Sequence, residues 1–124
     1  MDSLYQAQLL AHYKNPLNNV LLQEYTFEHV AFNHLCGDQA TVRLLLVNHI
    51  VKGISIQAKG CVISVATASL FSGYIKEKSC CDLKNMGSGL VLDMIGIPLG
   101  PVRIKCALLS FDVIMQGLNQ YCCK

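Results

Sequence analysis

The sequence has no tryptophan and few charged residues, which make up 15% of its 124 residues. With only 7% aromatic residues, a hydrophobic core has to rely on Leu, Ile, Val and Ala. The net charge is only +2, and no stretch interleaves basic with aromatic residues, so nucleic-acid binding is not expected. The hydrophobic share of 52% is the reverse of the composition of a disordered chain.

Long uninterrupted apolar runs are also missing. The most apolar stretch, residues 90–102, is broken by Asp93, two glycines and two prolines, and no window approaches the about 18 residues of a membrane helix. Residues 1–15 lack the basic region and apolar run of a secretory signal. We therefore expect a cytoplasmic protein with no membrane partner. Its length matches one ordinary domain, so residues 1–124 are expected to form a single domain.

Seven cysteines are present in this short chain. A reducing cytoplasm keeps thiols free, so separated cysteines there are often metal ligands or reactive groups. Cysteine is also an ordinary buried residue, so each one is weighed by its surroundings. The adjacent pairs Cys80-Cys81 and Cys122-Cys123 fall in a polar loop and a terminal tail. We expect incidental exposed thiols there, because a disulfide between neighbours is strained.

The spacing of apolar residues predicts a helix first, then strands, then helices. Strands followed by helices, without alternation of the two, predict an α+β fold, here a three-stranded antiparallel sheet with helices packed on one face. The expected strands are 25–32, 40–47 and 51–58, and the expected helices are 3–14, 62–76, 88–95 and a last helix that covers 104–118.

Three cysteines stand at the boundaries of these elements. Cys36 and Asp38 flank Gly37 between the first two strands, and this glycine permits a tight turn that brings both side chains to one side. Cys61 and Cys106 lie at the starts of helices, where the helix dipole favours the thiolate that binds metal. Three thiolates and one carboxylate suit tetrahedral Zn²⁺ or an iron–sulfur cluster. For any one cysteine alone, a buried structural thiol stays the alternative.

Four blocks of the chain resemble, in order, the U-type iron–sulfur assembly family of IscU, SufU and the amino-terminal domain of NifU. The blocks are Tyr-Lys-Asn-Pro at 13–16, Cys-Gly-Asp at 36–38, Gly-Cys-Val-Ile-Ser-Val-Ala-Thr-Ala-Ser at 60–69 and Pro-Val-Arg-Ile-Lys-Cys-Ala at 101–107. The resemblance implies a SufE/NifU-like fold. It also places Cys36, Asp38, Cys61 and Cys106 at the family's metal- and cluster-ligand positions.

The residue before the last cysteine separates the branches of that family. Lys105 occupies the position at which IscU-like proteins carry a His, and this resembles SufU, although the usual SufU insertion before Cys106 is missing. A lysine ammonium cannot coordinate metal, so Asp38 becomes the natural fourth ligand and Lys105 is expected to pair with Asp38 or a thiolate. This favours zinc over a [2Fe-2S] cluster. The resemblance implies that sulfur is accepted by Cys36, as in SufU, or by Cys106, as in IscU.

The leading hypothesis is therefore an iron–sulfur cluster assembly scaffold or sulfur acceptor. It would receive persulfide sulfur from a cysteine desulfurase, bind zinc, iron or a [2Fe-2S] cluster, and serve apo iron–sulfur recipients. Beyond a sulfurtransferase-type activity, no enzyme is expected. The first alternative is a zinc-dependent sulfurtransferase partner of a desulfurase that carries no cluster. The second is a zinc-stabilised interaction domain without sulfur chemistry.

Overall fold

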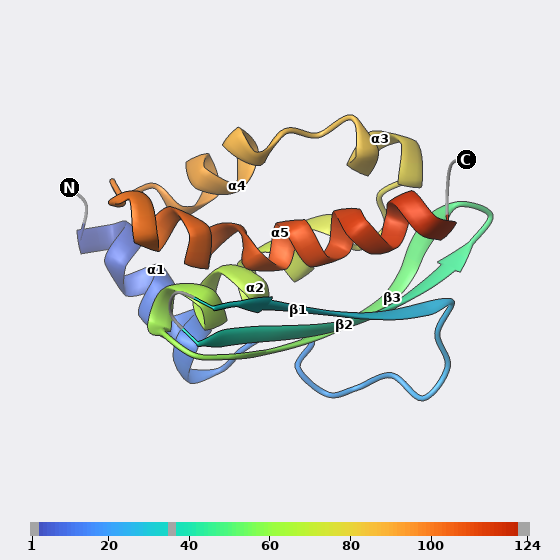
Figure 1. The fold of residues 1–124 in the computed structure, drawn as a ribbon, viewed down its shortest axis with the longest axis horizontal. Coiled ribbons are helices and arrows are strands. Elements are labelled where there is room, and N and C mark those ends of the chain that lie inside the picture. Colours follow the sequence, from blue (N-terminus) through green and yellow to red (C-terminus); the bar gives the residue numbers. More distant parts are fainter. Residues whose placement is uncertain (1–2, 35–36, 122–124) are drawn as a thin grey trace.

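The computed structural model describes residues 3–34 and 37–121. Its strands form a three-stranded antiparallel sheet in the order β1-β2-β3, with helices gathered on one side of it (Figure 1). The predicted α+β fold is confirmed. In chain order the elements are α1 (Ser3–Lys14), β1 (Phe27–Asn33), β2 (Asp38–Val47), β3 (Ile50–Lys59), α2 (Val62–Ile75), α3 (Cys80–Lys84), α4 (Ser88–Ile95) and α5 (Pro101–Tyr121).

The core lies between the sheet and the long helix α5. Ala40, Val42 and Leu44 alternate along β2 and are fully buried, because every second side chain of a strand points to the same face. Helix α5 runs along the sheet and packs on β1 and β2, while α2 packs on β3 (Figure 1). Each fully buried aliphatic side chain contributes about 1.5–3 kcal/mol to this packing.

Helix α1 is fixed to α2 by a shared hydroxyl group. Ser69 Oγ accepts the backbone N–H of Leu17 at 2.7 Å and lies 2.7 Å from His12 Nδ1. The helix ends at Lys14, two residues before Pro16, because the residue before a proline resists helical dihedral angles. The amino-terminal segment is thus held against the layer that carries the site.

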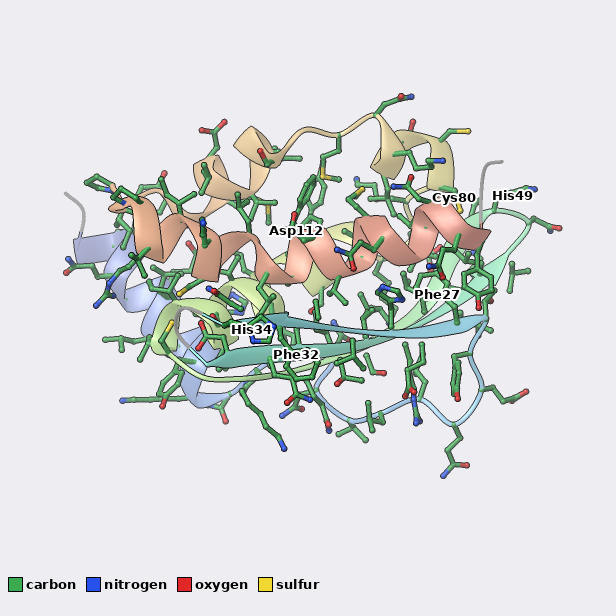
Figure 2. The ribbon with its side chains drawn as sticks, viewed as in Figure 1. Phe27, Phe32, His34, His49, Cys80 and Asp112 are labelled. Carbon is green, nitrogen blue, oxygen red and sulfur yellow. The ribbon has the colours of Figure 1, made fainter. Side chains whose placement is uncertain are left out.

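The short helix α3 is where the structure departs from the sequence prediction. Cys80 and Cys81 were expected in a polar loop, but Ser79 caps a helical turn by accepting the N–H of Asp82 at 3.1 Å. Cys80 is 1% exposed and belongs to the core, so its prediction as an exposed thiol is wrong, whereas Cys81 is an exposed free thiol (Figure 2). The pair at 122–123 lies outside the described residues. No helix of the described ranges is long and apolar enough to be a membrane span.

Candidate metal centre

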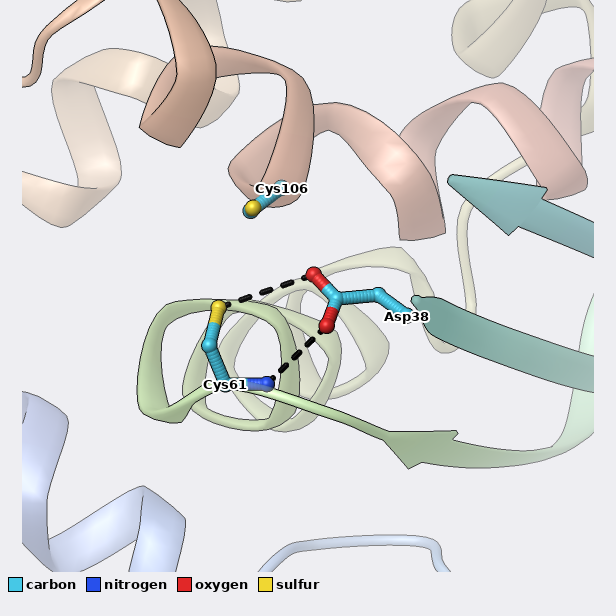
Figure 3. A group of neighbouring side chains, drawn as sticks. All are labelled: Asp38, Cys61 and Cys106. Carbon is cyan, nitrogen blue, oxygen red and sulfur yellow. Dashed lines mark hydrogen bonds between the residues drawn. The ribbon is translucent and has the colours of Figure 1, made fainter. Parts of the chain in front are cut away.

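One end of the sheet meets the amino-terminal halves of two helices. Asp38 is the first residue of β2, Cys61 directly precedes α2, and Cys106 lies in the second turn of α5. One ligand atom from each of the three lies within 4.8 Å of the others. Figure 3 shows the Asp38 carboxylate, the Cys61 sulfur and the Cys106 sulfur turned toward one space. The structure therefore brings together three of the four predicted site residues, and Cys36 lies outside the described part of the chain.

The Asp38 carboxylate is anchored on both of its oxygens. Oδ1 accepts the backbone N–H of Cys61 at 3.0 Å, and Oδ2 accepts the hydroxyl of Ser64 at 2.5 Å and the thiol of Cys61 at 3.6 Å. The residue is 1% exposed, and burial raises the pKa of its carboxyl group, but hydrogen bonds from Ser64, Cys106 and Cys61 outweigh it and hold the pKa below its usual value. Asp38 is thus kept as an anion, the form in which a carboxylate binds a metal ion.

Gly60 makes the room that Asp38 occupies. Its φ of +137° lies in a region that side chains rarely adopt, and a Cβ atom built on it would overlap Oδ1 of Asp38. Glycine is therefore required before Cys61 both by the backbone conformation and by the lack of space for a side chain. The backbone at the end of β3 and the carboxylate at the start of β2 approach each other closely because no side chain stands between them.

Cys106 also contacts the end of β1. Its sulfur accepts a hydrogen bond from Asn33 Nδ2 at 3.7 Å, and the residue is 2% exposed. Asn33 is also the strand partner of Asp38, and its carbonyl accepts the N–H of Gly37 at 2.8 Å, which closes the turn between β1 and β2. The same residue thus contacts Cys106 and helps to set the start of β2.

Two sulfurs and one buried carboxylate form a donor set that fits Zn²⁺. Tetrahedral zinc with sulfur and oxygen ligands places neighbouring ligand atoms about 3.5–3.8 Å apart, so the present atoms need only small inward movements. Soft thiolates disfavour Ca²⁺ and Mg²⁺, which take oxygen ligands. The sequence predicts a third sulfur from Cys36, two residues before Asp38.

Lys105 is not paired with Asp38, one of the two partners predicted for it from the sequence. It is exposed and forms no ion pair with Asp38 in the part of the chain that the structure describes. Successive residues of a helix are turned by about 100°, so Lys105 faces away from the direction of Cys106. Instead it borders a groove of about 270 Å³ between β1 and α5, which is lined by Phe32, Asn33, Lys105, Leu108, Leu109 and Asp112.

His34 also lies outside the centre. Its exposed ring stacks on that of Phe32 with a centroid separation of 6.1 Å, and both rings are labelled near the strand ends in Figure 2. The exposure and the stacking agree with an ordinary loop histidine.

Two residues of the centre were missed at the level of sequence. Ser64 follows Cys61 by three positions in a helix, a spacing that puts both side chains on one face, so this signal was available. Asn33 carries no comparable signal, because its contact with Cys106 joins positions 73 residues apart. It depends on the register of β1 and on how α5 lies across the sheet.

Fold and site together define a small α+β protein in which a sheet end and two helix starts bring together two cysteines and an aspartate that could hold a metal ion. Residues 4–124 match the model of the NifU-like N terminal domain. The chain therefore belongs to the NifU-like N-terminal domain family.

Curated relatives cover nearly the whole chain. It is 30% identical to the zinc-dependent sulfurtransferase SufU of Bacillus subtilis, over 95% of this chain and 91% of that protein. It is 25% identical to the iron–sulfur cluster assembly scaffold protein IscU of Buchnera aphidicola subsp. Baizongia pistaciae, over 94% of each. The resemblance drawn from the four sequence blocks is confirmed.

Solved structures share the fold. The amino-terminal part of a NifU-like protein from Brucella abortus superposes with a TM-score of 0.78 at 20% identity, over 94% of this chain and 92% of that one. At this identity the likeness establishes the architecture alone. It agrees with the three-stranded sheet and one-sided helices described above.

Proposed function

We propose that this chain is an iron–sulfur assembly protein that accepts sulfur from a cysteine desulfurase at a zinc-binding centre. The observation that carries the proposal is the convergence of Asp38, Cys61 and Cys106 within 4.8 Å in a member of this family. The relatives supply the chemistry, since one is named a zinc-dependent sulfurtransferase and another an iron–sulfur scaffold. The proposed ligands are Cys36, Asp38, Cys61 and Cys106.

The proposed reaction is an exchange between a thiolate and a persulfide. A thiolate of Cys36 or Cys106 attacks the terminal sulfur of the desulfurase persulfide, one S–S bond forms as the other breaks, and the desulfurase cysteine leaves as a thiolate. The numbers of atoms and electrons balance without an added reductant. Bound zinc would hold the cysteines as thiolates, the nucleophilic form.

The residues of this chain supply placement and charge for that exchange. Asp38, anchored by Ser64 and the Cys61 N–H, keeps one ligand in position while a thiolate is engaged elsewhere. The apo iron–sulfur proteins of the cell are the proposed recipients. Since thiolate chemistry needs a reducing compartment, the cytoplasm remains the expected location.

Mass spectrometry tests the proposal directly. The zinc-loaded protein is mixed with a cysteine desulfurase and cysteine, and the intact chain is expected to gain the mass of one sulfur. Cys36→Ser or Cys106→Ser should abolish this gain, depending on which residue accepts first, whereas Cys81→Ser, at an exposed free thiol, should leave it unchanged. No gain in the wild type while the desulfurase turns over would favour a zinc-stabilised interaction domain instead.

A second function, as a scaffold that holds a [2Fe-2S] cluster, is favoured by the IscU relatives and by the same sulfur-rich donor set. Anaerobic incubation with iron and sulfide, followed by visible absorption, separates the two functions. A cluster gives sulfur-to-iron charge-transfer bands, and zinc does not. If only zinc is retained, the sulfurtransferase role without a cluster is supported.

A further inference from the structure

Asn33 is a buried polar residue beside the metal centre. Only 8% of it is exposed, and its amide Nδ2 lies 3.7 Å from the sulfur of Cys106. Buried amide groups are almost always hydrogen-bonded, and here the acceptor is a side chain from another element, 73 residues away. Asparagine at this strand end thus has a partner in the metal centre itself.

The direction of this hydrogen bond matters for the chemistry. An N–H that donates to sulfur stabilises negative charge on it and restricts the rotation of the cysteine side chain. Groups that hydrogen-bond to metal ligands commonly change metal affinity or activity by about 10–100-fold. Cys106 has such a group in Asn33 at the end of β1. Figure 3 shows Asp38 and Cys61 near the same sulfur.

We propose that Asn33 is a positioning residue for Cys106, whose amide N–H orients the Cys106 sulfur and lowers its electron donation to a bound metal ion. The inference rests on the metal centre proposed above and adds to it a residue beyond the ligand set. Through this hydrogen bond, Asn33 sets how tightly the thiolate is held and therefore how readily it is released for sulfur exchange.

The backbone of Asn33 allows the side-chain effect to be isolated. Its carbonyl accepts the N–H of Gly37, and its main chain pairs with Asp38, so both contacts survive a change of side chain. Leucine has the branched shape of asparagine and the same number of side-chain heavy atoms, but it has no donor. Asn33→Leu therefore removes the N–H···S bond while it leaves the turn between the strands in place. Asn119, exposed on α5, offers the matched control Asn119→Leu.

Cobalt(II) is the probe, because its bonds to thiolates give intense charge-transfer absorption. The wild type and Asn119→Leu are expected to show the same band energies and dissociation constants. In Asn33→Leu the band is expected to move to lower energy, because a thiolate without its hydrogen bond gives up electrons more easily. Cobalt binding, measured against a competing chelator, should weaken about tenfold, because the Cys106 side chain loses the contact that orients it and its thiolate is no longer stabilised against protonation.

The outcomes separate the two proposals. Equal band energies and dissociation constants within threefold for Asn33→Leu and the wild type overturn the role of Asn33 and leave the metal centre intact. A wild type without cobalt–thiolate absorption refutes the metal centre itself, and the role of Asn33 with it. If circular dichroism shows that Asn33→Leu is unfolded, Asn33→Ala replaces it under the same expectations.

Discussion

The close approach of Gly60 to Asp38 makes Gly60→Ala a sharp test of the metal centre. The alanine Cβ would overlap Oδ1 of Asp38, and the backbone would hold a φ of +137° that alanine resists. Rotation of the Asp38 carboxylate relieves the overlap, but it breaks the hydrogen bond of 3.0 Å from the Cys61 N–H. The substitution therefore displaces a proposed ligand without removing it.

The two effects have different sizes and different targets. Backbone strain of about 1–3 kcal/mol lowers the stability of the whole fold. Loss of a hydrogen bond to a charged group costs about 1.5–3 kcal/mol and falls on the placement of Asp38. Since about 1.4 kcal/mol corresponds to a factor of ten, we expect zinc binding by Gly60→Ala to weaken about 10–100-fold.

Competition with a chromophoric zinc chelator measures this change, with Gly89→Ala as the control. Gly89, in α4, has no left-handed φ and has open space around its missing Cβ, so Gly89→Ala should behave as the wild type. Zinc affinity of Gly60→Ala within threefold of that of the wild type would refute the steric argument.

Two further substitutions test the charges around the centre. Ser64→Ala removes the donor to Asp38 Oδ2, so we expect metal-free protein to lose about 1.5–3 kcal/mol in urea unfolding at pH 7. The pKa of Asp38 is lower in the folded than in the unfolded protein, so the hydrogen bond stabilises the fold above the unfolded pKa of about 3.9. This stabilisation is lost as the pH falls through the folded pKa. An equal loss of stability in Ser64→Ala at pH 2.5 would contradict the argument. Desolvation raises the pKa of Asp112 beside the groove, so its charge at pH 7 lowers the stability of the fold. Asp112→Asn should therefore stabilise the protein at pH 7, by less than about 1 kcal/mol because the residue is exposed. This gain in stability should vanish below the unfolded pKa of the aspartate. Destabilisation by Asp112→Asn at pH 7 would be evidence for an attractive partner.

Helices whose ends are set by nearby residues in the sequence could be predicted from the sequence. The bounds of α1 and α4 agree with the prediction, since Pro16 closes off the first helix and Gly96, with a φ of +74°, ends the other. The five-residue helix α3 was missed because tertiary contacts define it. Ser79 forms an isolated bridge with Ile50 of β3, which places the cap before Cys80.

The site residues likewise divide into those with a local sequence signal and those placed by tertiary contacts. Cys61 and Cys106 were recognisable by residue type and position at helix starts, and Ser64 by its helical spacing from Cys61. Asn33 was not, because only the strand register and the crossing of α5 bring it to Cys106. Of the two partners predicted for Lys105, Asp38 is not its partner, because the Lys105 side chain is exposed whereas Asp38 is buried beside Cys61 and Ser64.

Burial within the centre bears on which thiol meets a partner first. Asp38 and Cys106 are 1% and 2% exposed, and Cys106 is enclosed by Asn33, Ser64 and the sheet end, whereas Cys61 is half-buried. An incoming persulfide has to reach its acceptor in line with the S–S bond, which a buried sulfur does not permit without movement of its surroundings. The burial therefore disfavours Cys106 as the first acceptor of sulfur, so we expect Cys36→Ser rather than Cys106→Ser to abolish the gain of sulfur mass.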